Sequence, residues 1–105
     1  MKIQFNTDNN ITGKESLEAY VSEKINAGLK QFADKVTRIE VHLSDVNAHK
    51  SGGEDIQCKI ETRLQGVQPI TVTAKDTSKD KAVSEAISKA KSALSKVVGK
   101  MQDHH

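Results

Sequence analysis

Residues 79–101 read KDKAVSEAISKAKSALSKVVGKM, and this stretch carries the strongest periodic pattern in the chain. Its apolar residues recur every three or four positions, which predicts one long amphipathic helix. A helix with a single apolar stripe must cover it against another layer, so the rest of the chain has to supply that layer. The predicted buried stripe consists of Val83, Ala86, Ile87, Ala90, Leu94, Val97 and Val98.

The opposite side of this predicted helix is rich in lysine and serine. The segment holds six lysines against two acids, a net charge of +4, whereas the other residues hold ten basic and twelve acidic side chains. Positive charge concentrated on one element suits a phosphate backbone better than a small-molecule pocket. Lys89, Lys96 and Lys100 lie near one side of the helix, with Lys81 about two turns nearer its N-terminus. A lysine stripe can also serve solubility alone, so both interpretations stay open at this point.

The preceding residues predict one more helix and four strands. Residues 14–33 have apolar side chains at helical spacing, and Gly28 marks a place where this helix can approach another element closely. Thr12 or Gly13 is the expected cap of that helix, and Asp76 or Thr77 that of the last one. A polar, mobile loop is expected over residues 47–55. Alternating apolar and polar residues place the strands at 2–5, 36–45, 56–65 and 70–74.

This order, β-α-β-β-β-α, predicts an α+β fold. Three consecutive strands with short connections form an antiparallel meander, and the N-terminal strand pairs with the strand after the first helix. Two helices then pack side by side on one face of a four-stranded sheet, as in double-stranded-RNA-binding domains. We expect one domain over residues 1–101 and a disordered tail over 102–105. The opposite, solvated face would carry Lys2, Gln4, Arg38, Glu40, His42, Lys59, Glu61, Arg63 and Thr73.

No pattern of catalytic or metal-binding residues appears. Cys58 alternates with Ile56 and Ile60 and is expected in the core, whereas His42 faces outward, so an enzyme built on this pair is the weakest hypothesis. The sequence contains no CxxC, HxxxH, GxGxxG or GxxxxGK[ST] motif. We therefore predict a protein without enzymatic activity, catalytic residues, metal or cofactor.

Composition narrows the possible partners further. Two Phe, one Tyr and no Trp favour contact with an RNA backbone over stacking on bases. No apolar run is long enough to span a bilayer, so no membrane partner is expected. A single cysteine fits a reducing cytoplasm. We expect a cytoplasmic monomer without a small-molecule substrate.

The ordered elements resemble the ribosome hibernation promoting factor family, also called ribosome-associated inhibitor A or sigma-54 modulation protein. The similarity extends from Met1 to about Lys100. It includes the Ile-Thr pair before the first helix, within Asn10-Ile11-Thr12, and a strand that ends in V-x-L, at 41–43. The first helix matches L-x-x-x-V-x-x-K-hydrophobic over residues 17–25, and the last helix matches A-I-x-x-L-I-D-K-L-x-x-Q-L-x-K over residues 82–96.

The resemblance implies a factor that binds the small ribosomal subunit through ribosomal RNA. Such a factor blocks the sites of messenger and transfer RNA in stationary or stressed cells. A protein-interaction module that kept the fold and lost ribosome binding is the alternative. Lys24, Lys89 and Lys96 match basic positions of the family, and Lys91 and Lys100 are basic neighbours. Together with the helical row, the expected RNA-binding residues are Lys24, Lys81, Lys89, Lys91, Lys96 and Lys100.

The chain also departs from the family pattern. Ser92 stands where the family has Arg, and Ala86 and Ala90 replace larger apolar residues, which predicts closer packing of the last helix on the sheet. The chain resembles a divergent short form without the C-terminal dimerisation domain of long members. We expect such a form not to dimerise ribosomes by itself.

Overall fold

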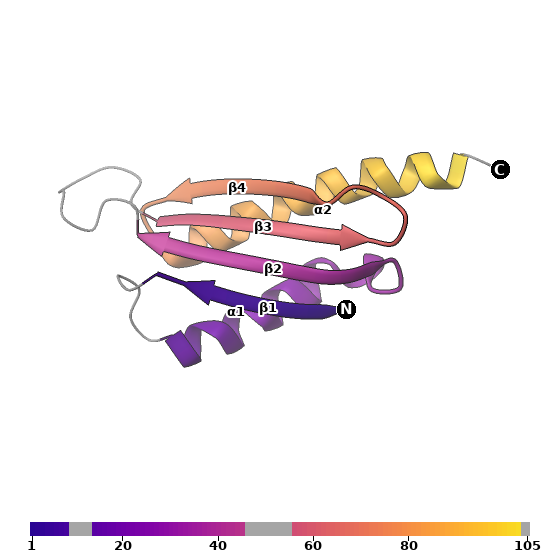
Figure 1. The fold of residues 1–105 in the computed structure, drawn as a ribbon. Helices are drawn as coiled ribbons and strands as arrows, with labels where there is room; N and C mark the ends of the chain where they lie inside the picture. Colours follow the sequence, from indigo (N-terminus) through magenta and orange to yellow (C-terminus); the bar gives the residue numbers. More distant parts are fainter. Residues whose placement is uncertain (9–13, 46–55, 104–105) are drawn as a thin grey trace.

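The computed structural model describes residues 1–8, 14–45 and 56–103, which form a two-layer α+β fold (Figure 1). The elements follow the predicted order β-α-β-β-β-α, with one short 3₁₀ helix after the first α-helix. Their bounds are β1 Lys2–Thr7, α1 Lys14–Gly28, η1 Lys30–Phe32, β2 Val36–Asp45, β3 Ile56–Leu64, β4 Ile70–Asp76 and α2 Lys79–Asp103.

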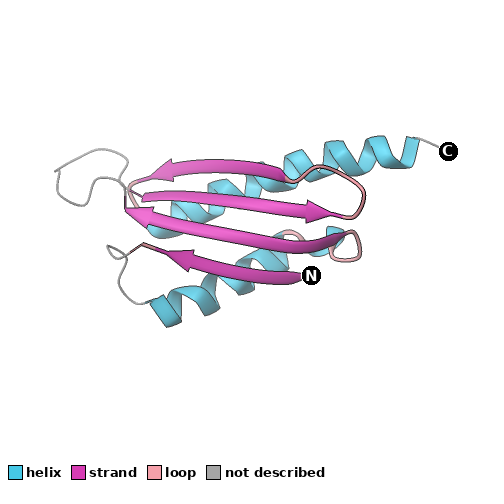
Figure 2. Ribbon diagram, in the orientation of Figure 1, coloured by secondary structure: helices cyan, strands magenta, loops and turns pink. Residues whose placement is uncertain are grey.

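The four strands form one sheet in the order β1-β2-β3-β4. β1 pairs with β2 in parallel, with Phe5 opposite Val41, which confirms the predicted partner of the N-terminal strand. β2, β3 and β4 are antiparallel neighbours, as the meander requires. Both helices cover the same face of the sheet, and none of the described elements covers the other face (Figure 2).

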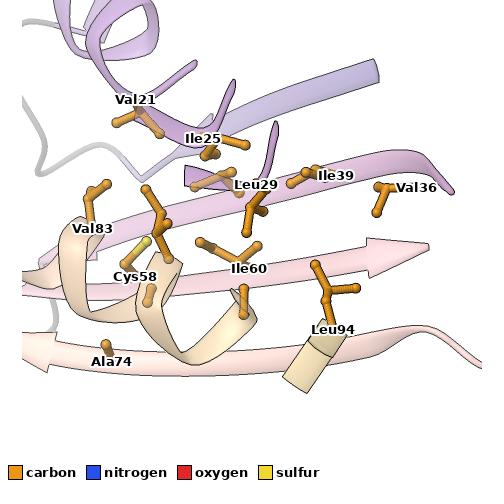
Figure 3. Packing of buried hydrophobic residues seen from close by; sticks show 14 of the residues in the cluster. Val21, Ile25, Leu29, Val36, Ile39, Cys58, Ile60, Ala74, Val83 and Leu94 are labelled. Carbon is orange, nitrogen blue, oxygen red and sulfur yellow. The ribbon is translucent and has the colours of Figure 1, made fainter. Parts of the chain in front are cut away.

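The core lies between the sheet and the helices (Figure 3). The predicted inward residues of β2 and β3, such as Ile39, Val41 and Ile60, are fully buried. Ala82, Ala86 and Ala90 of α2 are also buried, so small side chains bring this helix against β3 and β4. Thr62 is the one buried polar residue among the described ones, and its hydroxyl donates to the carbonyl oxygen of Ile70 at 3.3 Å.

The first helix is shorter than predicted. α1 ends at Gly28, and the chain continues as η1 rather than as one helix to residue 33. Glycine is a poor helix former, and the tighter turn lets both Leu29 and Phe32 reach the core.

Other boundaries differ by one or two residues. β1 and β4 continue to Thr7 and Asp76, and β3 ends at Leu64. α2 continues to Asp103, two residues beyond its predicted end. The predicted cap at Thr12 or Gly13, the predicted loop over 47–55 and residues 104–105 lie outside the described residues.

Candidate nucleic-acid interface

The cap of α2, which begins at Lys79, is Ser78 rather than Asp76 or Thr77. The hydroxyl oxygen of Ser78 accepts a hydrogen bond from the backbone N–H of Lys81 at 3.1 Å, the geometry of an N-cap. Asp76 instead accepts the backbone N–H of Thr77 at 2.7 Å, within the turn that precedes the helix. The expectation of a cap at Asp76 or Thr77 is therefore wrong, because both residues are used in that turn.

The lysines of α2 do not form a single stripe. Lys89, Lys96 and Lys100 fall on one side of the helix, because seven and eleven residues are close to whole numbers of turns. Lys91 is two residues from Lys89 and therefore points about 200° around the axis. This direction matches that of Ser84 and Ile87, which line the groove between the two helices. All the predicted lysines of α2 are exposed: Lys81, Lys89, Lys91, Lys96 and Lys100.

Lys89 connects α2 to the outer edge of the sheet. Its ammonium group donates to the carbonyl oxygen of Thr73, in the edge strand β4, at 2.8 Å. An ammonium group has three donors, so this contact leaves two for a ligand. The positive end of Lys89 is thus held at the boundary between the helical layer and β4.

Lys24 lies in a different environment, on α1 and against α2. Its ammonium group donates to the carboxylate of Asp80 at 3.1 Å and to the hydroxyl of Ser84 at 2.6 Å. It also lies 5.3 Å from the centre of the Tyr20 ring, and the Tyr20 hydroxyl donates to Asp80. Hydrogen bonding with Tyr20, and then with Asp80, raises the pKa of Lys24. Lys24 of α1 therefore links this helix to α2 within the protein itself, without any ligand.

Three of these side chains, Tyr20, Lys24 and Ser84, line a groove between α1 and α2. The groove has a volume of about 540 Å³, and Gly28 of α1 and Ile87 of α2 both line it. A Cβ on Gly28 would lie 2.7 Å from the Cγ2 of Ile87, which confirms the expected close approach at this glycine. The lining residues are Tyr20, Glu23, Lys24, Ala27, Gly28, Ser84 and Ile87.

The exposed surface of α1 is acidic rather than basic. Among the charged α1 side chains after Lys14, Glu15, Glu18 and Glu23 are exposed, whereas Lys24 is paired with Asp80. The outer surface of the helical layer is therefore divided between an acidic α1 and a basic α2. Of the two helices, α2 would therefore attract a phosphate backbone more strongly.

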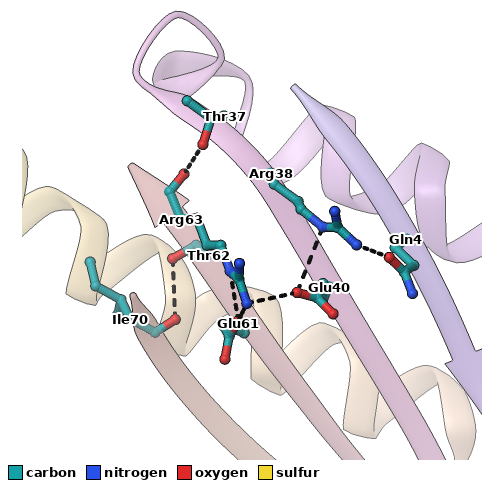
Figure 4. Close-up of polar contacts among 8 residues, drawn as sticks. All are labelled: Gln4, Thr37, Arg38, Glu40, Glu61, Thr62, Arg63 and Ile70. Carbon is teal, nitrogen blue, oxygen red and sulfur yellow. Dashed lines mark hydrogen bonds and ion pairs between the residues drawn. The ribbon is translucent and has the colours of Figure 1, made fainter. Parts of the chain in front are cut away.

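The open face of the sheet carries the mixed charges that the sequence predicts, in an ion-pair network (Figure 4). Glu40 lies between two arginines, 3.6 Å from Nε of Arg38 and 3.2 Å from Nη2 of Arg63. Arg63 also contacts Glu61 at 2.9 Å, and Arg38 donates to the side-chain oxygen of Gln4. Two carboxylates here balance two guanidinium groups, so this part of the face is close to neutral.

Cys58 and His42 lie on opposite faces of the sheet. Cys58 is fully buried in the core, as predicted, and burial raises the pKa of its thiol to about 12. His42 is exposed on the open face. A thiolate nucleophile needs an accessible sulfur and an activating partner, and Cys58 has neither among the described residues.

Residues 1–8, 14–45 and 56–103 contain no cluster of His, Cys, Asp or Glu that could hold a metal ion. None of the helices in these residues is long and apolar enough to cross a membrane.

Sequence reasoning missed the interhelical cluster of Tyr20, Lys24, Asp80 and Ser84. Tyr20 and Lys24 are four residues apart on α1, and Asp80 and Ser84 are four residues apart on α2, so each pair lies on one side of its helix. That spacing is the only signal in the sequence for the contact. Whether the two pairs face each other depends on how the helices are placed on the sheet, and local periodicity does not determine that placement.

Comparisons with known proteins converge on one group. A family model described as sigma 54 modulation protein / S30EA ribosomal protein matches residues 3–102. The chain is similar in structure to the N-terminal domain of Protein Y from Thermus thermophilus, with a TM-score of 0.73 and 21% identity over 92% of this chain and 99% of that one. It is also similar to a ribosomal subunit interface protein from Coxiella burnetii, with a TM-score of 0.71 and 17% identity over 94% and 99% of the two chains. Among curated protein sequences, none matches the chain.

Proposed function

The chain belongs to the family of sigma 54 modulation proteins and S30EA ribosomal proteins, and from this membership we propose that it binds the small ribosomal subunit. The family consists of ribosome-associated proteins that are not enzymes. The resemblance identified in the sequence and the predicted absence of enzymatic activity are thus confirmed. Ribosome association also fits a cytoplasmic protein.

The observation that carries the proposal is the exposed row Lys89, Lys96 and Lys100 on α2. These side chains stand at helical spacing on the basic side of the molecule, away from the acidic surface of α1. Lysines of this kind bind phosphates as point charges, without reading base sequence. Ribosomal RNA offers such phosphates, so we propose that α2, rather than both helices equally, faces the RNA.

Bound in this way, the domain would act by steric occlusion. We propose that it fills the sites of messenger and transfer RNA and so stops translation, as a monomer, in stationary or stressed cells. The two packed layers give a preformed body that needs no cofactor for this role. Lys24 would support the interface indirectly, by fixing α1 against α2, and Lys91 would stand at its margin.

The test measures how much of the purified chain sediments with ribosomes at a series of increasing salt concentrations. The charge-reversed variant Lys96→Glu/Lys100→Glu should lose at least about tenfold in affinity, because lost phosphate contacts lower binding steeply. These two residues are preferred to Lys89, whose ammonium group also holds the edge of β4. The control is Lys2→Glu/Lys30→Glu, which has the same charge change on the β1 and α1 side.

Sedimentation of the ribosomes through a sucrose gradient distinguishes ribosome binding from the alternative, a protein-interaction module. Migration of the unsubstituted chain with small subunits at low salt, and its release at high salt, would support electrostatic RNA binding. Migration only at the top of the gradient at every salt would refute ribosome binding and favour the protein-interaction module. Equal affinity of the two charge-reversed variants would refute α2 as the contact surface.

A further inference from the structure

The open face of the sheet holds two lysines that lie outside its ion-pair network. Lys59 of β3 and Lys75 of β4 are both exposed, and neither forms an ion pair or hydrogen bond with any of the described residues. In the sheet register Lys59 stands opposite Thr73 and Lys75 opposite Gln57, so the two lysines are diagonal neighbours. Like charges at such spacing disfavour the folded state slightly unless something else neutralises them.

The acids of the neighbouring strands do not provide this neutralisation. Asp45 and Asp76 are both in register with the buried Ile56, which places them on the side of the helices. Glu61 lies two residues from Lys59 on the open face, but its carboxylate contacts Arg63 at 2.9 Å. Among the described residues, this part of the open face therefore carries positive charge without a carboxylate of its own.

Protection of a sheet edge does not explain the pattern. Lysines on edge strands commonly prevent unwanted strand pairing, and Lys75 of β4 fits that role. Lys59, however, lies on the inner strand β3, where no edge needs protection. Opposite Lys59 on β2 stands the exposed His42, which adds a further possible donor rather than an acid.

These lysines are continuous with the row on α2. Thr73 pairs with Lys59 in the sheet, and its carbonyl oxygen accepts the hydrogen bond from Lys89. Lys89, Lys59 and Lys75 thus cross β4 from the helical layer to the open face, and we call this set the β4 band. The end of the open face occupied by Arg38 and Arg63 is neutral by comparison.

We propose that the β4 band is a second phosphate-binding surface, so that RNA contacts the chain across the edge of β4 as well as along α2. The inference rests on the proposed function and deepens it, since it adds Lys59 and Lys75 to the contact surface. The expected ligand atoms are phosphate oxygens rather than bases, because the band consists of lysines and holds no aromatic side chain for stacking.

The experiment compares two neutralised variants by sedimentation with purified small ribosomal subunits between about 50 and 200 mM salt, a range over which phosphate contacts change affinity strongly. The band variant is Lys59→Gln/Lys75→Gln, and the matched control is Lys2→Gln/Lys30→Gln. Each lost phosphate contact should reduce the log–log salt slope by about 0.7 to 0.9, so the band variant should lose about 1.4 to 1.8 in slope. The control should keep the slope of the unsubstituted chain.

A second measurement locates the contact directly. Acetylation of the bound and free chain, read by mass spectrometry, should show Lys59 and Lys75 protected in the complex and Lys2 and Lys30 unprotected. Thermal unfolding of both variants checks that the sheet is intact.

The possible outcomes have distinct meanings. Equal slopes for the band variant and the control, while the unsubstituted chain binds, would refute the β4 band and leave the proposed function standing. A loss of affinity without a change in slope would point to contact with ribosomal protein and would also refute it. Failure of the unsubstituted chain to bind would refute the proposed function, and this inference with it.

Discussion

At the scale of single residues, Gly28 controls the distance between the two helices. Its φ is not positive, so backbone conformation does not require glycine there. What requires it is space, because a Cβ would come within 2.7 Å of Cγ2 of Ile87. That methyl group is attached to the branched Cβ of a buried residue, so it has little freedom to move away.

We predict that Gly28→Ala destabilises the protein by about 1 to 3 kcal/mol, the usual range for a forced contact in a packed site. The control is Gly99→Ala in α2, where nothing lies within 4 Å of the added Cβ. That variant should be stabilised by about 0.5 to 1 kcal/mol, since alanine is the better helix former. Urea unfolding of both variants gives the two free energies. Stabilisation of both would show that the helices move apart without cost.

A double-mutant cycle tests the contact itself. Ile87→Leu removes the branched methyl group and should cost less than about 1.5 kcal/mol alone. In the Ile87→Leu background, Gly28→Ala should lose most of its penalty, because the atom it meets is gone. Additive effects of the two substitutions would assign the penalty to another cause.

At the scale of elements, the start of α2 shows how local signals can be misassigned. Asp76, Thr77 and Ser78 all have side chains that can cap a helix. Only the hydroxyl of Ser78 reaches the backbone N–H of Lys81, three residues ahead. Asp76 is the last residue of β4, and its carboxylate accepts the backbone N–H of Thr77 in the turn. Because the strand ends there, Ser78 is the residue positioned to cap the helix.

Ser78→Ala should therefore lower the free energy of unfolding by about 1 kcal/mol, the typical cost of losing an N-cap side chain. Thr77→Ala should have a smaller effect, because Thr77 is exposed and its contacts lie within the turn. Chemical denaturation of the two variants compares these costs. A larger loss for Thr77→Ala would contradict the assignment of the cap.

Other elements were predictable because their signal is local. Alternation such as that of Ile39 and Val41 in β2, or Cys58 and Ile60 in β3, identifies strands and their buried faces. The end of α1 at Gly28 was not predictable from periodicity, since Leu29 and Phe32 continue the apolar pattern through η1. Tertiary packing decides there between a longer helix and a tighter turn.

The candidate site was predictable only in part, because charge along a helix does not reveal what lies beside it. The row on α2 follows from spacing alone. Lys24 matches a basic position of the family, yet in the fold it faces Asp80 and Ser84 of the other helix. Lys59 and Lys75 become relevant only when the register places them next to Thr73 and the Lys89 contact.

At the scale of the whole molecule, a net charge of +2 conceals a separation of charge. Acids face outward on α1, cations face outward on α2 and across β4, and the open face between Arg38 and Glu61 is balanced. This separation gives the domain one basic side, which orients it toward a polyanion more effectively than its net charge would. The cluster of Tyr20, Lys24 and Asp80 holds the two oppositely charged helices together.

That cluster makes the stability of the two-helix layer depend on pH. The hydrogen bond from Tyr20, and then that from Lys24, lowers the pKa of Asp80. A carboxyl group whose pKa is lower in the folded state stabilises the protein above its unfolded pKa, about 3.9, and loses that contribution as pH falls through the folded value. The pKa of Lys24 is raised, so Lys24 stabilises the folded state below its unfolded pKa of about 10.4. This contribution is lost as pH rises through the higher folded pKa.

We therefore predict that Asp80→Asn lowers the melting temperature at pH 7, and that its difference from the unsubstituted chain shrinks as pH falls below about 4. Comparing the two proteins at each pH removes the contribution of the other carboxyl groups to the melting temperature, because these groups titrate in both proteins. Asp34→Asn is the matched control, because Asp34 is exposed and forms no ion pair or hydrogen bond with the described residues. A difference for Asp80→Asn that stays constant down to pH 2 would show that the cluster acts through packing, without help from the ionised carboxylate.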